Sequence, residues 1–190
     1  GLAAFSASAM SLGFILMRAR DVTHSNVLLG AFLTTAGVVD LIVGVLCFII
    51  GNSWAACTFL MFGGFWSSYS FLLMNVGNIV EAYSSTKEYQ EAIAFYILPW
   101  CIFSFALWLC TLKSTVSLTS LMFSIWLFLT LITISYFTAS VATFKATGFF
   151  CILAGLLGFY NTYAGLADKT NSYFVLSSIP LPNYATTPNS

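Results

Sequence analysis

Charged residues are almost missing from this sequence. Only six of its 190 residues are lysine or arginine and six are aspartate or glutamate, so 6% are charged while 59% are hydrophobic. Soluble globular domains carry about 25% charged residues, and a mean hydropathy of +0.94 excludes that class. The net charge is zero and the basic residues are scattered, which excludes a nucleic-acid partner and a polybasic lipid-binding segment. The sequence predicts an integral membrane protein.

The residue types of catalytic and metal centres are also scarce. His24 is the single histidine, and no second histidine or carboxylate cluster accompanies it, so we expect a solvated loop residue. No nucleophile stands with a base and no glycine loop suits a phosphate, so neither an enzyme nor a cofactor or metal is expected. The cysteines fall in apolar runs without close pairing and are predicted to be small core residues rather than disulfides: Cys47, Cys57, Cys101, Cys110 and Cys151.

Long apolar stretches are what the sequence does contain. Crossing about 30 Å of hydrocarbon takes roughly 20 helical residues. Six stretches suit this length: 1–17, 27–50, 55–77, 91–112, 115–138 and 148–167. We therefore expect an all-α fold with six transmembrane helices in residues 1–167, followed by a polar C-terminal tail in 168–190. Because the first stretch starts at once with Gly1, we also expect a polar leader before it in a longer protein.

Glycines recur along two of these stretches at helical spacing. The second stretch has one every seven residues, and the last stretch has four, which predicts close packing of helix backbones. The glycines are Gly30, Gly37, Gly44 and Gly51 in the second stretch, and Gly148, Gly155, Gly158 and Gly165 in the last. The sequence thus indicates a bundle with glycine-rich helix packing, in which the last helix is central.

Asp40 is the only ionisable residue deep within any stretch, and it lies one turn from both Gly37 and Gly44. A carboxyl group at the centre of a membrane helix costs roughly 2.5 to 3.5 kcal/mol on insertion scales. Two interpretations remain open. Asp40 is either a group that couples transport to protons or a neutral, hydrogen-bonded packing residue.

The third stretch contains an aromatic stripe. Phe62, Trp66 and Tyr69 have the spacing i, i+4, i+7, which puts them on one helix face. Such a stripe is typical of core packing, and the neighbouring serines allow the alternative that it lines a polar pathway.

Several strings occur in the same order as in a known family. They are Gly1-Leu2-Ala3-Ala4-Phe5, Gly51-Asn52-Ser53, Phe62-Gly63-Gly64-Phe65-Trp66, Cys110-Thr111-Leu112-Lys113-Ser114-Thr115-Val116, Phe159-Tyr160-Asn161 and Asn171-Ser172-Tyr173. Together they resemble the acetate uptake transporter family, which includes bacterial succinate-acetate permeases and fungal acetate and ammonia-export proteins. The last strings are most similar to the fungal forms.

The resemblance implies a homohexamer in the plasma membrane, in which each six-helix protomer has its own substrate path. It also implies cytoplasmic termini, although the charges of the loops alone favour the opposite orientation. The apolar constriction of the family path maps to Phe5, Phe62 and Ile125. Phe62 lacks the tyrosine hydroxyl of the family pattern, and Ile125 stands where leucine is usual.

Such a constriction would act as a dehydrating filter. A carboxylate anion pays many kcal/mol to enter a dry neck, whereas the neutral acid, or the anion with a proton, pays far less. We therefore expect transport of acetate and similar small carboxylates across the lipid bilayer, with Ser8, Ser124 and Asn161 as polar groups along the path. The alternatives are a non-transporting structural or sensory oligomer and a channel related to ammonia export.

Overall fold

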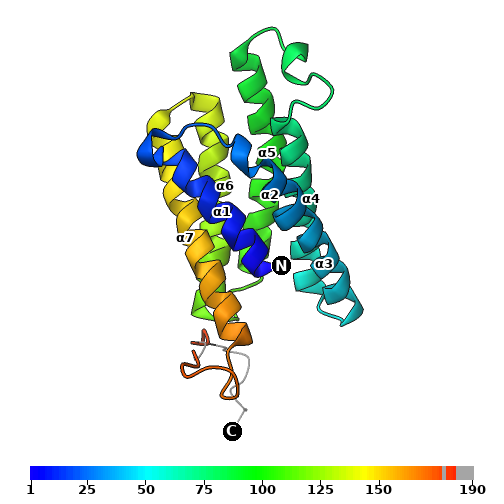
Figure 1. Cartoon of the computed structure of the whole chain (residues 1–190), viewed down its shortest axis with the longest axis vertical. Coiled ribbons are helices and arrows are strands. Elements are labelled where there is room, and N and C mark those ends of the chain that lie inside the picture. The colour runs from blue at the N-terminus through cyan, green and yellow to red at the C-terminus, as the bar shows by residue number, and fades with distance from the viewer. Residues whose placement is uncertain (177–178, 183–190) are drawn as a thin grey trace.

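The computed structural model describes residues 1–176 and 179–182, and nearly all of the regular structure in them is helical (Figure 1). The helices are α1 (Leu2–Leu16), α2 (Leu29–Leu33), α3 (Asp40–Ile49), α4 (Ser53–Leu73), α5 (Thr86–Leu109), α6 (Val116–Thr138) and α7 (Val141–Leu166). Short 3₁₀ turns cover Ala19–Asp21, Asn26–Leu28 and Val80–Ala82. The predicted all-α fold is confirmed. Residues 177–178 and 183–190 of the predicted tail lie outside the described residues.

Six apolar helical segments are present, but they differ in length. The segment Asn26–Ile49, which combines α2, a π-helical turn at Thr34–Val39 and α3, is long and apolar enough to cross a membrane, as are α4, α5, α6 and α7. With 15 residues, α1 is about 22 Å long and falls short of a full crossing. The chain is a multi-pass membrane protein with five candidate spans and one shorter apolar helix.

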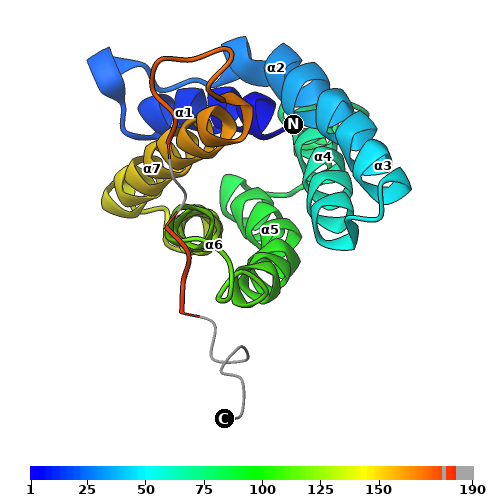
Figure 2. The same ribbon diagram turned by 90° about the horizontal axis from the view of Figure 1, so that it is seen from below.

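The helices form a ring, seen from below in Figure 2. Helix α1 packs on α7, α7 on α6 and α6 on α5, while α4 packs on α3. Aromatic side chains join α4 to α5, because the Phe65 ring of α4 lies 6.0 Å from Tyr96 and 5.1 Å from Trp100 between ring centroids. The buried core occupies the inside of this ring.

The close approach predicted for the last helix is found where α7 crosses α1. A Cβ atom built on Gly13 would lie 2.7 Å from the carbonyl oxygen of Gly148, and one built on Gly148 would lie 2.7 Å from the carbonyl oxygen of Gly13. Gly155 and Gly158 are equally close to α1, whereas a Cβ on Gly165 would meet nothing within 4 Å. Glycine is therefore required at the crossing but not at the end of α7.

The glycines of the second stretch do not form one packed face, contrary to prediction. Gly37 and Gly44 contact α4 through Ser67 and Leu60, but Gly30 and Gly51 have nothing within 4 Å of a built Cβ atom. The π turn at Thr34–Val39 holds more residues than an α turn, so a seven-residue repeat does not keep to one side across it. Gly51 lies beyond the helix, at a turn with φ +81°.

Helices α5 and α7 begin earlier than predicted. Helix α5 starts at Thr86 rather than Glu91, because Ser85 caps its N-terminus: the Glu88 N–H donates to Ser85 Oγ at 3.2 Å. The Glu88 carboxylate accepts from the N–H of Ser84, the residue before the N-cap, at 2.8 Å. Helix α7 starts at Val141 with Ser140 as its N-cap.

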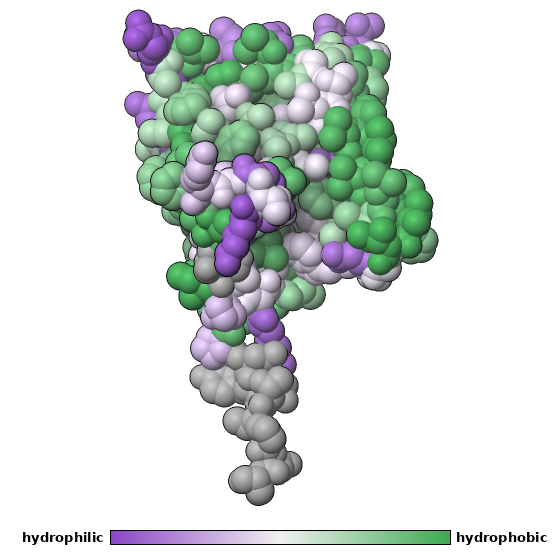
Figure 3. Space-filling model, turned by 60° about the horizontal axis from the view of Figure 1, so that its bottom comes forward, coloured by the Kyte–Doolittle hydropathy of each residue, from purple (hydrophilic) through white to green (hydrophobic). Residues whose placement is uncertain are grey.

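The flank of the molecule is apolar over α3, where Phe48 is 70% and Ile49 72% exposed (Figure 3). Side chains of this kind suit contact with lipid or with another subunit. Cys57 and Cys110 are exposed as well, so the prediction that all five cysteines are core residues is wrong for these two. All five are free thiols, and His24 is exposed in its loop, both as predicted.

Candidate functional site: three hollows along α1, α4 and α6

The three residues of the predicted constriction meet at one cavity. Phe5 from α1, Phe62 from α4 and Ile125 from α6 are each buried, and all three line a hollow of about 180 Å³ that we call the lower cavity. The remaining lining residues are Leu2, Asp40, Trp54, Thr58, Phe59, Leu118, Leu121 and Met122. The structure thus brings together side chains that are 120 residues apart in the sequence (125 minus 5).

Asp40 is a member of this wall. It follows directly after the π turn, a feature frequent at functional sites, and it is 1% exposed. Its Oδ1 atom has no hydrogen-bond partner among the described residues, where the only ion pair within 4 Å joins Lys87 to Glu91. A buried carboxyl oxygen without a donor is costly. A proton bound to this oxygen would remove its charge, and a water molecule or a solute in the lower cavity can donate the missing hydrogen bond.

A much smaller space follows one turn higher. This middle hollow measures about 10 Å³, which is about the room that one water molecule needs. Its lining is almost wholly apolar: Leu12, Phe65, Trp66, Tyr69, Ile97, Phe128, Leu129 and Ile132. The Trp66 ring connects the two spaces, since its centroid lies 6.4 Å from that of Phe5 in the lower cavity. The tightest of these hollows is therefore not at Phe5, Phe62 and Ile125, which wall a wider space, but a turn above them.

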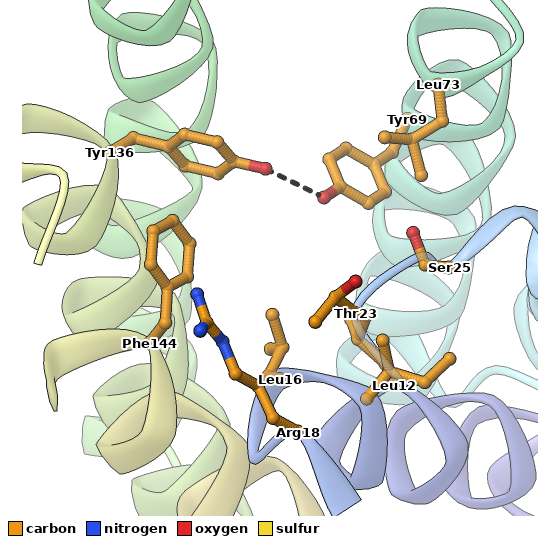
Figure 4. A pocket seen from close by; sticks show the side chains of 10 residues that line it. Leu12, Leu16, Arg18, Thr23, Ser25, Tyr69, Leu73, Tyr136 and Phe144 are labelled. Atoms are coloured by element: carbon orange, nitrogen blue, oxygen red, sulfur yellow. Dashed lines mark hydrogen bonds between the residues drawn. The ribbon is translucent and has the colours of Figure 1, made fainter. Parts of the chain in front are cut away.

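The third space, the upper cavity, opens at the other end of α1 (Figure 4). It measures about 230 Å³ and shares Leu12 and Tyr69 with the middle hollow. The hydroxyl groups of Tyr69 and Tyr136 point at each other at 3.4 Å, and Arg18, Thr23 and Ser25 face the same space. No sequence pattern predicts this site, although Tyr69 ends the aromatic stripe and Arg18 directly follows the first apolar stretch.

The predicted polar residues of the path have other surroundings. Ser124 Oγ donates to the Ser120 carbonyl at 2.8 Å, and the Asn161 side chain accepts from Ser117 Oγ at 2.9 Å while donating to the Leu157 carbonyl at 2.7 Å. Ser8 is buried, and its hydroxyl has no partner among the described residues. None of the three lines the lower cavity. Helical serines commonly bond the carbonyl four residues back, and asparagine here ties α7 to α6.

The three hollows follow the same faces of the same helices. Phe5 and Leu12 lie two turns apart on α1, Phe62, Trp66 and Tyr69 follow one another on α4, and on α6 Ile125 is one turn from Leu129. The hollows therefore lie one above another inside the ring, with the narrowest in the middle. A solute that followed these faces would meet its narrowest space at the middle hollow.

Comparison with known proteins agrees with this arrangement. The sequence matches the description "GPR1/FUN34/yaaH family" over residues 1–183. The chain belongs to this family. It is 34% identical to the "Ammonia transport outward protein 3" of Saccharomyces cerevisiae, over 96% of this chain and 66% of that protein. It is 31% identical to "Acetate permease A" of Emericella nidulans, over 96% of this chain and 65% of that protein. The chain thus spans about two thirds of the length of these curated relatives.

A solved structure shares the fold. The bacterial acetate channel SatP superimposes with a TM-score of 0.81 at 19% sequence identity, over 94% of this chain and 95% of that chain. The resemblance predicted from the short strings is confirmed, because the family, the fold and the relatives are those expected. These three relatives bear the names of transport proteins and none that of an enzyme, in line with the expectation that the chain is not an enzyme.

Proposed function

We propose that this protein conducts acetate and similar small carboxylates across the plasma membrane, through the three hollows that α1, α4 and α6 line. The observation that carries the proposal is the meeting of Phe5, Phe62 and Ile125 at one cavity inside the helix ring. The names of the relatives, an acetate permease and an acetate channel, support the same substrate.

The middle hollow gives the route its selectivity. An ionised carboxylate cannot keep its hydration in a space of about 10 Å³, and transfer of a bare charge into apolar surroundings costs many kcal/mol. The neutral acid loses only the hydration of a hydroxyl and a carbonyl. The neutral acid, or the anion together with a proton, is therefore the form that passes most easily. Trp66, Phe128 and Leu129 must move to admit it.

Buried polar atoms without partners lie on the helices that form the route. Asp40 Oδ1, Ser8 Oγ and Trp66 Nε1 each have no hydrogen bond among the described residues. Such groups usually have a partner in folded proteins. A carboxylic acid passing along the route can supply one to Asp40 in the lower cavity or to Trp66 in the middle hollow. Asp40 is the residue that we propose takes up or releases the coupled proton.

The test is uptake of labelled acetate into proteoliposomes that contain the purified protein, with the outside more acidic than the inside. We expect uptake well above that of empty vesicles. Equal uptake would reject the proposal. In that case the variant Phe62→Tyr/Ile125→Leu decides what remains, since a gain of flux identifies a degenerate pore and no gain favours a structural or sensory oligomer.

A second candidate substrate is ammonia, because one relative is named an ammonia transport outward protein. The two substrates carry opposite charges when ionised. Methylammonium uptake, measured in the same vesicles, separates them: a carboxylate route conducts acetate at a much higher rate.

The exposed apolar face of α3 is relevant to how copies of the protein assemble in the membrane. We propose a homohexamer with cytoplasmic termini, in which this face is covered by lipid or by neighbouring copies. The mass of the protein in nanodiscs, measured by native mass spectrometry, tests the number of subunits, and six copies are expected.

A further inference from the structure

The upper cavity has one charged side chain in its wall. Of the ten residues that line it, Arg18 alone carries a charge at neutral pH. Figure 4 shows its guanidinium reaching into the cavity beside Phe144, opposite the hydroxyl groups of Thr23 and Ser25. No carboxylate lies within 4 Å of this guanidinium in the part of the chain that the structure describes. The cavity therefore holds a cation without a counter-charge.

The backbone conformation after α1 places Arg18 at the upper cavity. Arg18, Arg20 and Asp21 all have left-handed backbone angles, with φ of 56°, 54° and 63°. Residues other than glycine adopt this conformation rarely, because the Cβ atom then crowds the following carbonyl oxygen. Three such residues within four positions, with Ala19 between the first two, turn the chain sharply after α1. Arg18 then ends over the cavity, while Arg20 does not line it. This pair offers a matched comparison of two arginines in one turn.

The cavity is large enough for a hydrated ion. Its volume of about 230 Å³ is many times the 10–15 Å³ or so that one water needs, in contrast to the middle hollow below it. At its inner end, the Tyr69 and Tyr136 hydroxyls form a long hydrogen bond of 3.4 Å, in which one hydroxyl donates and the other keeps its proton for another acceptor. An anion at this level would meet a guanidinium on one side and hydroxyl donors on the others.

We propose that the upper cavity binds the small carboxylate in its ionised, hydrated form, with Arg18 as the charged partner and the Tyr69–Tyr136 pair at the inner edge. A guanidinium only donates hydrogen bonds and repels cations. This mouth thus concentrates carboxylate anions and disfavours ammonium before dehydration begins in the middle hollow. The inference rests on the proposed function and names the chemical form that enters at this end.

The experiment compares wild type with Arg18→Gln, Arg18→Lys and Arg20→Gln in proteoliposomes at neutral pH, where acetate is almost wholly ionised. We expect Arg18→Gln to raise the half-saturating acetate concentration roughly threefold to tenfold, the loss typical of one net hydrogen bond. Arg18→Lys should keep part of the effect, because it retains the charge. Arg20→Gln should stay within about twofold of wild type, and methylammonium uptake should not fall in Arg18→Gln.

A binding measurement separates this inference from the proposed function. Line broadening of ¹³C-acetate by the protein in detergent reports binding whether or not transport occurs, and it should weaken in Arg18→Gln only. Equal effects of Arg18→Gln and Arg20→Gln would mean a general surface charge, and no effect of either would mean that the cavity does not bind the anion; both results overturn the inference. Acetate flux in wild type with unchanged binding in Arg18→Gln would leave the route intact and reject this site alone. A melting curve of each variant tests whether it is folded. If Arg18→Gln is unfolded, acetate binding by Arg18→Lys and the loss of acetate binding at high salt test the inference in its place.

Discussion

The upper and lower cavities differ in chemistry although the same three helices wall them. The upper cavity presents an arginine and four hydroxyl groups, whereas the lower cavity is walled by aromatic and aliphatic side chains with Asp40 and Thr58 as exceptions. They are separated by a hollow with room for about one water molecule. The difference shows how one helix bundle can recognise a solute twice, first by its charge in water and then by its ability to enter a dry space.

The largest effect is expected when the lower cavity is filled. Ile125→Trp places an indole in a space of about 180 Å³, so acetate flux should fall at least tenfold without loss of the fold. Ile134→Trp is the control, because Ile134 lies on the same helix but is exposed on its outer side. Labelled acetate uptake measures both, and equal fluxes in the two variants would show that the solute does not pass Ile125.

The second test concerns the proton. Asp40→Asn keeps the shape of the side chain, but its amide does not take up or release a proton at the pH of the assay. If Asp40 couples transport to protons, acetate should no longer accumulate against its gradient when the outside is acidic, although exchange of labelled for unlabelled acetate continues. Accumulation equal to that of wild type would mean that Asp40 is a packing residue and does not couple transport to protons.

The third test concerns α1, which lines all three hollows and is held by its crossing with α7. A Cβ atom on Gly148 would lie 2.7 Å from a carbonyl oxygen, so Gly148→Ala should destabilise the protein by about 1–3 kcal/mol and disturb both cavities together. Gly165→Ala meets nothing within 4 Å and serves as the control on the same helix. Melting temperatures in detergent measure the pair, and similar losses in both variants would contradict the crossing.

The smallest effect is expected from Phe62→Tyr. A hydroxyl in the lower cavity adds one donor to a passing carboxylic acid, and one hydrogen bond contributes about 0.5–1.5 kcal/mol. We therefore expect a twofold to tenfold gain in the preference for acetate over lactate. Phe71→Tyr, on the exposed side of α4, should change nothing. A preference that stays at the wild-type value would mean that the solute does not contact residue 62.

The sequence contained most of the fold because each element has a local signal. Apolar length predicted the helices, and Gly148, Gly155 and Gly158 predicted the tight packing of the last one. The start of α5 was missed although Ser85 and Glu88 have the spacing of a capping box. The π turn before Asp40 leaves no comparable mark in the sequence, and for that reason the second glycine repeat was misread.

The site was harder to predict, because a cavity depends on distances between helices. The family resemblance pointed to Phe5, Phe62 and Ile125, which line one cavity, and their role in transport stays a prediction. The position of the narrowest space at Trp66 and Leu129 depends on packing that no single helix specifies. The polarity of Ser124 and Asn161 predicts a place along the path. The hydrogen bonds that they form within and between helices are equally compatible with the sequence.

The most direct test is a pair of structures in a lipid nanodisc, one with saturating acetate and one without it. We expect additional density of the size of acetate in the lower cavity between Phe5, Phe62 and Ile125, and at a second position beside Arg18. A map in which lipid or other side chains fill the lower cavity, with acetate density at neither position, would contradict this.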